Sequence, residues 1–117
     1  MNIYHCLIDL KEEGKALAFA QAMEAWMTHL HEEGTILSWR LMRRKLNLAS
    51  DRFTDFLLVV EFQDFAQFDR AFRLVGSTKD EHVGKLHRMV HEMIAHKYCG
   101  LYRTFPDPER VERLGLI

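Results

Sequence analysis

The hydrophobic residues at the start of the chain alternate and then change to helical spacing. One parity of residues 2–10 is wholly apolar and consists of Tyr4, Cys6, Ile8 and Leu10. This period of two predicts a strand with one buried face. Over residues 15–33 apolar side chains recur every three or four positions, which predicts a long amphipathic helix. We expect this helix to end at Gly34, because a left-handed C-cap favours a residue without a Cβ atom.

The middle of the chain predicts a β-hairpin. Residues 36–47 alternate loosely between apolar and polar, and residues 53–62 contain a strongly apolar run. The polar segment 49–52 between them is short. Strands that are joined by a short polar loop pair as antiparallel neighbours, so we expect both segments to be strands of one sheet.

Two capping patterns in the second half of the chain predict helices. Asp64, with Gln67 three residues later, has the form of a capping box and opens a short helix. Thr78 with Glu81 repeats this form after a Gly-Ser interruption and opens a second helix. We expect the second helix to run to about Ala95.

The last predicted strand covers residues 97–105, and two prolines that follow it stop the pattern. A chain of 117 residues has the length of one domain and buries a single core. We therefore expect residues 1–105 to form one domain and residues 106–117 to form a C-terminal tail.

The element order β-α-β-β-α-β predicts an α+β fold, in which two helices pack on one face of a four-stranded antiparallel sheet. The other face should meet water, but the side chains that we assign to it are too apolar for open solvent. These side chains include Ile3, Leu7, Leu57, Val59, Tyr98 and Tyr102. The pattern therefore requires that something covers this face of the sheet.

Composition and charge limit the kinds of partner that we expect the protein to bind. Hydrophobic residues make up 48% of the chain and charged residues 28%, with a formal net charge of −1, so there is no basic footprint for nucleic acid. No apolar run approaches the roughly 20 residues that cross a bilayer. Two cysteines and the absence of a leader-like N-terminal pattern favour a cytoplasmic protein. Cys6 and Cys99 should lie on adjacent antiparallel strands as buried thiols rather than as a redox pair.

The element order and the broken second helix resemble the dimeric α+β barrel superfamily over about residues 2–105. Within this span, the segments HLHEEG, SWRLMRRKL and VVEFQDFAQFDRAF are similar to an uncharacterised family of small bacterial proteins, DUF6614. The resemblance implies a ferredoxin-like subunit whose bare sheet face pairs with the same face of a second copy in a dimeric α/β barrel. The superfamily includes monooxygenases, isomerases, stress-responsive proteins and haem-binding enzymes, so the fold alone is a poor guide to function.

Strand parity places a set of polar side chains on the bare sheet face, because successive side chains point to opposite faces. The candidate catalytic residues are His5 as general base, Arg40 as a holder of an oxyanion or enolate, and Tyr102 as a group that orients an aromatic substrate. The candidate ligand-binding residues are Tyr98, Asp55, Glu61 and Arg44.

Two functional hypotheses fit this constellation. The first is a cofactor-independent enzyme of the monooxygenase or isomerase type that acts on a small aromatic or polyketide-like compound. The alternative is a non-catalytic ligand-binding or stress-responsive homodimer, in which Arg40 and Glu61 form an interfacial ion pair and His5 is a hydrogen-bonded structural residue. The glycines are scattered singly and form no cofactor motif, so we expect no cofactor.

A third hypothesis comes from four histidines, His82, His87, His91 and His96, in one predicted helix. On a helical wheel only His87 and His91 are neighbours, at one margin of the apolar stripe. They could bind one metal ion together, or His87 could bind haem, but zinc needs at least one further protein ligand. The simpler interpretation is that both are boundary histidines half covered by their neighbours, and we expect no metal site.

Overall fold

The computed structural model describes residues 1–46, 48–76 and 81–106. The elements in chain order are β1 (Asn2–Leu10), a 3-10 turn η1 (Glu13–Lys15), α1 (Ala16–Glu32), β2 (Ser38–Arg43), β3 (Phe56–Phe62), α2 (Phe65–Gly76), α3 (Glu81–His91) and β4 (Ile94–Tyr102). This is the predicted β-α-β-β-α-β order with the second helix divided into α2 and α3. The proposed C-terminal tail lies outside the described residues, apart from Pro106.

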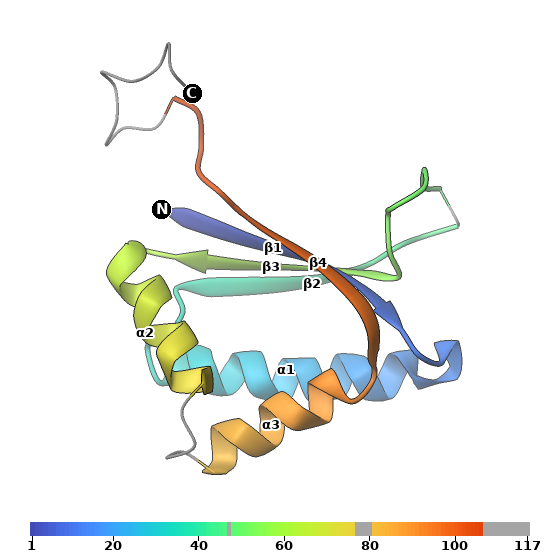
Figure 1. Cartoon of the computed structure of the whole chain (residues 1–117), viewed down its shortest axis with the longest axis horizontal. Coiled ribbons are helices and arrows are strands. Elements are labelled where there is room, and N and C mark those ends of the chain that lie inside the picture. The colour runs from blue at the N-terminus through green and yellow to red at the C-terminus, as the bar shows by residue number, and fades with distance from the viewer. Residues whose placement is uncertain (47, 77–80, 107–117) are drawn as a thin grey trace.

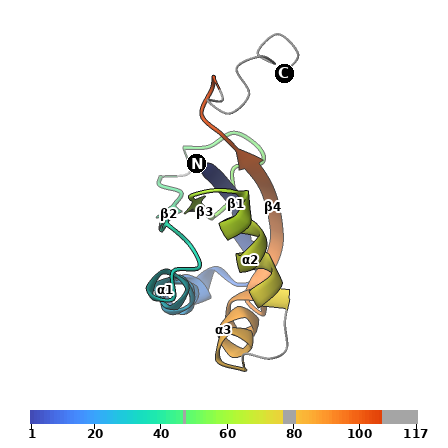
Figure 2. The same cartoon turned by 90° about the vertical axis from the view of Figure 1, so that its left-hand side faces the viewer.

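The strands form one antiparallel sheet with the order β2-β3-β1-β4. β1 lies in the centre, where Cys6 is opposite Leu58 of β3 on one side and Cys99 of β4 on the other. In Figures 1 and 2 the three helices lie on one side of this sheet. The fold is therefore the two-layer α+β arrangement that the hydrophobic pattern predicted.

The core fills the space between the sheet and the helices. The β1 parity that was expected to face the helices is confirmed, since Cys6, Ile8 and Leu10 are buried and Tyr4 packs against the core. Phe19 of α1 is fully buried, with its ring 5.0 Å from that of Phe56. Within the described residues, none of the helices has both the length and the apolar character that would cross a membrane.

The ends of two helices confirm sequence signals. Gly34 has φ +72, and its N–H donates to the carbonyl of His31 at 3.0 Å, while the next N–H, of Thr35, donates to Leu30 at 2.9 Å. These two bonds are a Schellman motif. At the start of α2, Asp64 accepts a hydrogen bond from the N–H of Gln67 at 2.8 Å, as a capping residue does.

Several predicted boundaries were wrong by a few residues. The hairpin strands are shorter than residues 36–47 and 53–62, and residues 45–46 and 48–53 of the loop between them are exposed. The histidine-bearing helix ends at His91 rather than near Ala95, because Ile94 already pairs with Leu10 in the sheet. β4 accordingly starts three residues before the predicted strand, and His96 lies on it. The Thr78 capping position lies outside the described residues.

The sheet face away from the helices is as apolar as predicted. Tyr98 and Tyr102 of β4 are 58% and 61% exposed, which is unusual for aromatic side chains on a sheet. Leu7 lies between Leu57 and Tyr98 in the strand register, with all three on this face. We refer to this surface as the open face.

Candidate functional site

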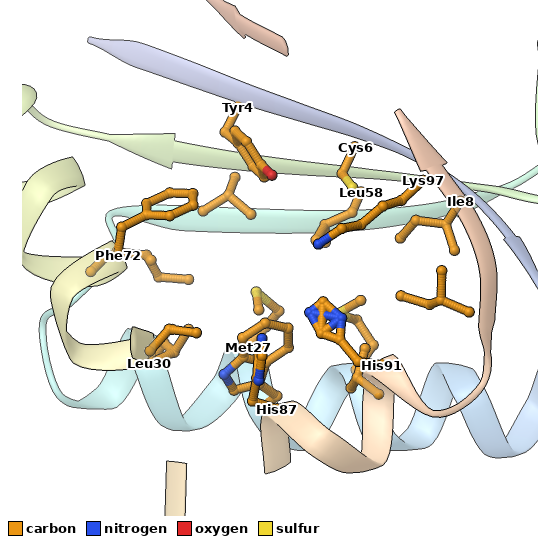
Figure 3. Close-up of a pocket in the computed structure, with 18 of the residues that line it drawn as sticks. Tyr4, Cys6, Ile8, Met27, Leu30, Leu58, Phe72, His87, His91 and Lys97 are labelled. Carbon is orange, nitrogen blue, oxygen red and sulfur yellow. The ribbon is translucent and has the colours of Figure 1, made fainter. Parts of the chain in front are cut away.

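A cavity of about 120 Å³ lies inside the subunit, between the helix-facing side of the sheet and the helices (Figure 3). Most of its wall is apolar and comes from the core side chains of β1, β3, α1 and α2. The polar groups in its wall belong to Tyr4, Cys6, Trp26, His87, His91 and Lys97. The cavity is therefore on the opposite side of the sheet from the candidate catalytic residues His5, Arg40 and Tyr102.

Two histidines of α3 form the floor at one end of the cavity. His87 and His91 are one helical turn apart, and their ring centroids are 4.0 Å apart in an edge-to-face arrangement. Trp26 of α1 contacts both, with centroid distances of 5.2 Å to His87 and 5.9 Å to His91. The expectation of half-covered boundary histidines is right about their burial, but their rings line the cavity because α3 packs against α1.

Burial disfavours the charged form of both histidines. It is the main cause that lowers the pKa of His91 to about 4, and the positive charges of His87 and Lys97 add to the effect. Burial likewise lowers the pKa of His87, with smaller contributions from Lys97 and Arg88. At neutral pH both rings are uncharged, so each offers one N–H donor and one nitrogen acceptor.

Among the described residues of the cavity wall, Lys97 has the one cationic side chain. It lies on β4 opposite Ile8, on the parity that faces the helices. Figure 3 shows the side chain reaching from β4 into the cavity, with its nitrogen toward the His91 ring. Within the described residues, neither ion pair of the structure involves Lys97. Lys97 was not among the site residues predicted from the sequence, although a lysine on the same parity as Cys99 was a visible signal.

Tyr4 and Cys6 line the sheet side of the cavity, and the thiol of Cys99 lies beside that of Cys6. The sulfur atoms of Cys6 and Cys99 are 2.9 Å apart, as expected for adjacent antiparallel strands. Burial, followed by hydrogen bonding with Cys99, raises the pKa of Cys6 to about 12 and raises that of Tyr4 well above its usual range. Cys6 is therefore a protonated and weakly nucleophilic thiol. Cys99 is exposed rather than buried as expected, because β4 is an edge strand.

Trp26 supplies a donor without an acceptor. Its indole Nε1 atom is buried and has no hydrogen-bond partner among the described residues. A buried N–H that stays unpaired costs about 1–3 kcal/mol, so such groups usually have a partner in the functional state. An acceptor atom of a bound ligand would satisfy it.

The candidate catalytic residues from the sequence lie on the open face. His5 and Tyr102 contact each other, with ring centroids 5.2 Å apart. Arg40 is in the same row as His5 but is separated from it by Val59 of β3, so the two are two strands apart. Within one subunit the structure brings together the histidine and the tyrosine, and leaves the arginine at the far edge strand.

Of the candidate ligand-binding residues, Glu61 and Tyr98 lie on the open face, whereas Arg44 and Asp55 lie just beyond the ends of β2 and β3. Most of the four have partners within the subunit. Arg44 forms an ion pair with Asp55 at 3.6 Å, and Asp55 also accepts a hydrogen bond from the N–H of Leu10 at 3.1 Å. Glu61 accepts a hydrogen bond from the hydroxyl of Ser38 at 3.0 Å. Tyr98 is exposed beside Leu7.

The remaining histidines of the predicted helix do not join His87 and His91. His82 contacts His29 of α1, with ring centroids 4.7 Å apart, and His96 is on β4 opposite Asp9. In the described part of the chain, no three His, Cys, Asp or Glu side chains lie close enough to hold a metal ion. His87 and His91 would need a third ligand from outside this set.

Comparison with known proteins now bears on this geometry. The model of a family of unknown function, DUF6614, matches residues 1–117. The chain belongs to the DUF6614 family. The resemblance seen in its sequence segments is thereby confirmed. None of the curated proteins is similar enough in sequence to match this DUF6614 protein.

Solved structures with the same fold are similar in shape and distant in sequence. A ferredoxin-like dabb family protein from Mesorhizobium loti has a TM-score of 0.66 and 13% identity, covering 89% of this chain and 96% of that one. SnoaB, a cofactor-independent oxygenase from Streptomyces nogalater, has a TM-score of 0.64 and 11% identity, covering 91% and 97%. A dimeric protein of unknown function from Bacteroides fragilis has a TM-score of 0.61 and 11% identity, covering 88% and 95%.

These comparisons confirm the predicted fold class. The DUF6614 protein has the ferredoxin-like α+β fold of dimeric α/β barrel proteins, with one four-stranded antiparallel sheet. At identities of 11–13% they show the fold alone. The function has to be argued from the cavity and the open face.

Proposed function

We propose that the DUF6614 protein binds a small aromatic compound in the cavity between its sheet and its helices. The observation that carries this proposal is the composition of the wall, in which apolar side chains surround one polar end made by Trp26, His87, His91 and Lys97. Ligand pockets typically combine an apolar wall with a few convergent polar groups. An apolar volume alone would be only a packing defect.

The size of the cavity favours a compound with a single ring. A cavity of about 150 Å³ binds benzene, and the cavity described here has about 120 Å³. Fused polyketide rings exceed this volume unless the helices move. We therefore narrow the proposed ligand from small aromatic or polyketide-like compounds to single-ring compounds.

We further propose a cofactor-independent enzyme, of the monooxygenase or isomerase type, in which His91 is the base. Its ring is neutral at pH 7, so a ring nitrogen can take a proton from the substrate. The pKa of about 4 makes it a weak base in the empty cavity, and the negative charge that forms on the substrate would raise this pKa as the proton moves. Lys97 would stabilise the anion that is left. An isomerase would return the proton to another carbon, whereas an oxygenase would pass electrons from the anion to molecular oxygen. SnoaB, which has the same fold, is a cofactor-independent oxygenase.

Assays with hydroxylated single-ring compounds test this activity. Oxygen uptake reports an oxygenase, and loss of deuterium label from the substrate reports an isomerase. His91→Gln should remove the activity, while His31→Gln, on the exposed side of α1, should retain it. If ring compounds bind but are not converted into a product, the protein binds ligands without catalysis, as the alternative hypothesis states. If none binds, the proposed function is wrong.

A cytoplasmic homodimer is the proposed assembly. The open face exposes Tyr98 and Tyr102 beside the apolar side chains of Ile3 and Leu7, and a second copy would bury all of them. The neighbour from Bacteroides fragilis is a dimeric protein with this fold. Pairing of open faces would produce the dimeric barrel that the sequence resemblance implies.

A second candidate site is the open face itself, and it depends on this dimer. The Nδ1 atom of His5 is buried without a hydrogen-bond partner in the described part of the chain, and Tyr102 contacts the ring. A ligand or a partner side chain between the two sheets could satisfy this atom. Arg40 would join His5 only from the partner subunit, since it is two strands away in its own.

A further inference from the structure

We propose that the cavity is selective for a single-ring aromatic anion, a carboxylate or a phenolate, whose charged oxygen atoms lie beside Lys97 and the indole N–H of Trp26. This inference rests on the proposed function, because it names the class of ligand that the same cavity takes. It adds the sign of the ligand's charge, the orientation of the ligand in the cavity, and two residues that determine which ligands bind.

The charge of the cavity wall is the first reason to expect an anionic ligand. Lys97 brings one positive charge to a wall that has no aspartate or glutamate among its described residues. Neither ion pair in the described part of the chain uses this lysine. Lys97 is exposed as a residue, so water hydrates its charge when the cavity holds no ligand. An anion in the cavity would be attracted by this charge and a cation would be repelled.

The second reason is that Trp26 and Lys97, at the same end of the cavity, both carry hydrogen-bond donors. Trp26 is 8% exposed, and its Nε1–H has no acceptor among the described residues. Its ring contacts His87 and His91, the same two rings that Lys97 affects electrostatically. An indole N–H can only donate, and an ammonium group can only donate. The buried Trp26 N–H lacks an acceptor, and the charge of Lys97 favours one that is negative. A carboxylate or a phenolate provides such an oxygen.

The rest of the cavity sets the orientation. Away from the polar end, the wall consists of core side chains such as Leu30, Val60, Phe62 and Phe72. This part suits the ring, and Figure 3 shows Phe72 and Leu30 on the opposite side of the cavity from Lys97. An aromatic anion would thus lie with its ring among these side chains and its oxygens beside the lysine.

The experiment is a calorimetric titration of the full chain with benzoate, 4-nitrophenolate and benzamide. Benzamide has the shape of benzoate without its charge. Because charge-assisted hydrogen bonds are the strong ones, we expect at least about tenfold tighter binding of an anion than of benzamide. Tighter binding of benzoate than of 4-nitrophenolate would assign the site to carboxylates, and the reverse would assign it to phenolates.

Substitutions locate the effect. Lys97→Met should remove the preference for the anion and leave benzamide binding in place, and Lys97→Arg should retain the preference. Trp26→Phe should weaken anion binding severalfold with a smaller effect on benzamide. Lys85→Met, an exposed position on α3, is the matched control and should bind like the unmodified protein. A melting curve for each variant shows that it is folded.

Two results would overturn the inference, and they are distinguishable. If benzamide binds as tightly as the anions, or if Lys97→Met keeps the full preference, the cavity takes aromatic rings without regard to charge and the proposed function stands alone. If neither the anions nor benzamide binds, the proposed function fails and the charge preference fails with it.

Discussion

The imidazole rings of His87 and His91 lie 4.0 Å apart on one turn of α3, and both line the cavity. Protonating both rings would cost free energy, because two positive charges would lie close together in an apolar cavity. Burial and the neighbouring positive charges lower both pKa values below the ordinary 6.5, that of His91 to about 4. Between pH 6.5 and about pH 4, the unfolded chain therefore binds more protons at His91 than the folded protein does.

This difference predicts a loss of stability in mild acid. Well above pH 6.5, these rings are uncharged in both the folded and the unfolded chain, so they do not reduce the free energy of unfolding. As the pH falls from 6.5 to about 4, the free energy of unfolding should decrease. Urea unfolding at several pH values measures the change. The double variant His87→Gln and His91→Gln should show a smaller decrease, and His31→Gln should behave like the unmodified protein. Equal slopes for the double variant and the unmodified protein would contradict this origin.

Filling the cavity should abolish ligand binding without unfolding the protein. Ala71 of α2 is 4% exposed and lines the cavity. In Ala71→Leu the added carbons occupy empty volume, so the cost of overpacking, usually about 1–3 kcal/mol, should be largely avoided. A melting temperature close to that of the unmodified protein, together with loss of benzoate binding in the calorimeter, is the expected result.

Its control is Ala25→Leu, which makes the same change at an exposed position of α1 and should leave binding intact. Unchanged binding by Ala71→Leu would mean that the ligand lies outside this cavity.

A charge on the open face should dissociate the dimer. Leu7 lies between Leu57 and Tyr98 on this face, and Leu7→Asp would place a carboxylate between the two sheets without a partner. Sedimentation velocity should change from a dimer to a monomer. Leu17→Asp, at a side chain of α1 that is 73% exposed, should remain a dimer. A Leu7→Asp variant that still sediments as a dimer would show that another surface holds the subunits together.

The end of α1 gives a test of the backbone geometry. Gly34 has φ +72, and a residue with a Cβ atom is strained there, so Gly34→Ala should lower the free energy of unfolding by about 1 kcal/mol. Gly14→Ala adds the same atom in open space at a position without a left-handed backbone, and should cost less. Chemical denaturation of the two variants measures the difference, and equal costs would argue against the Schellman motif.

The fold was predictable because local signals and the hydrophobic pattern agree. The alternation on β1, the glycine after α1 and the capping residue Asp64 each correspond to a feature of the structure. The end of α3 was not predictable, because helical spacing continues beyond His91 while Ile94 is already paired with Leu10. Pairing in a sheet overrides the local pattern there.

The candidate site was less predictable, because it depends on how layers pack. Strand parity correctly placed His5 and Tyr102 together, yet it gives no sign of a cavity on the other side of the sheet. That cavity combines Trp26 from α1 with His91 from α3 and Lys97 from β4, and Trp26 is far from the other two in the sequence. The local signals of its position were the pair His87 and His91 at the margin of an apolar stripe and a lysine on a helix-facing parity.

A crystal structure of the protein grown with benzoate decides between the two faces of the sheet. We expect density for a ring between the sheet and the helices, with the carboxylate within hydrogen-bond distance of the Lys97 nitrogen. Density for the ring between the open faces of two subunits, beside His5, with the inner cavity left without ligand, would contradict this expectation.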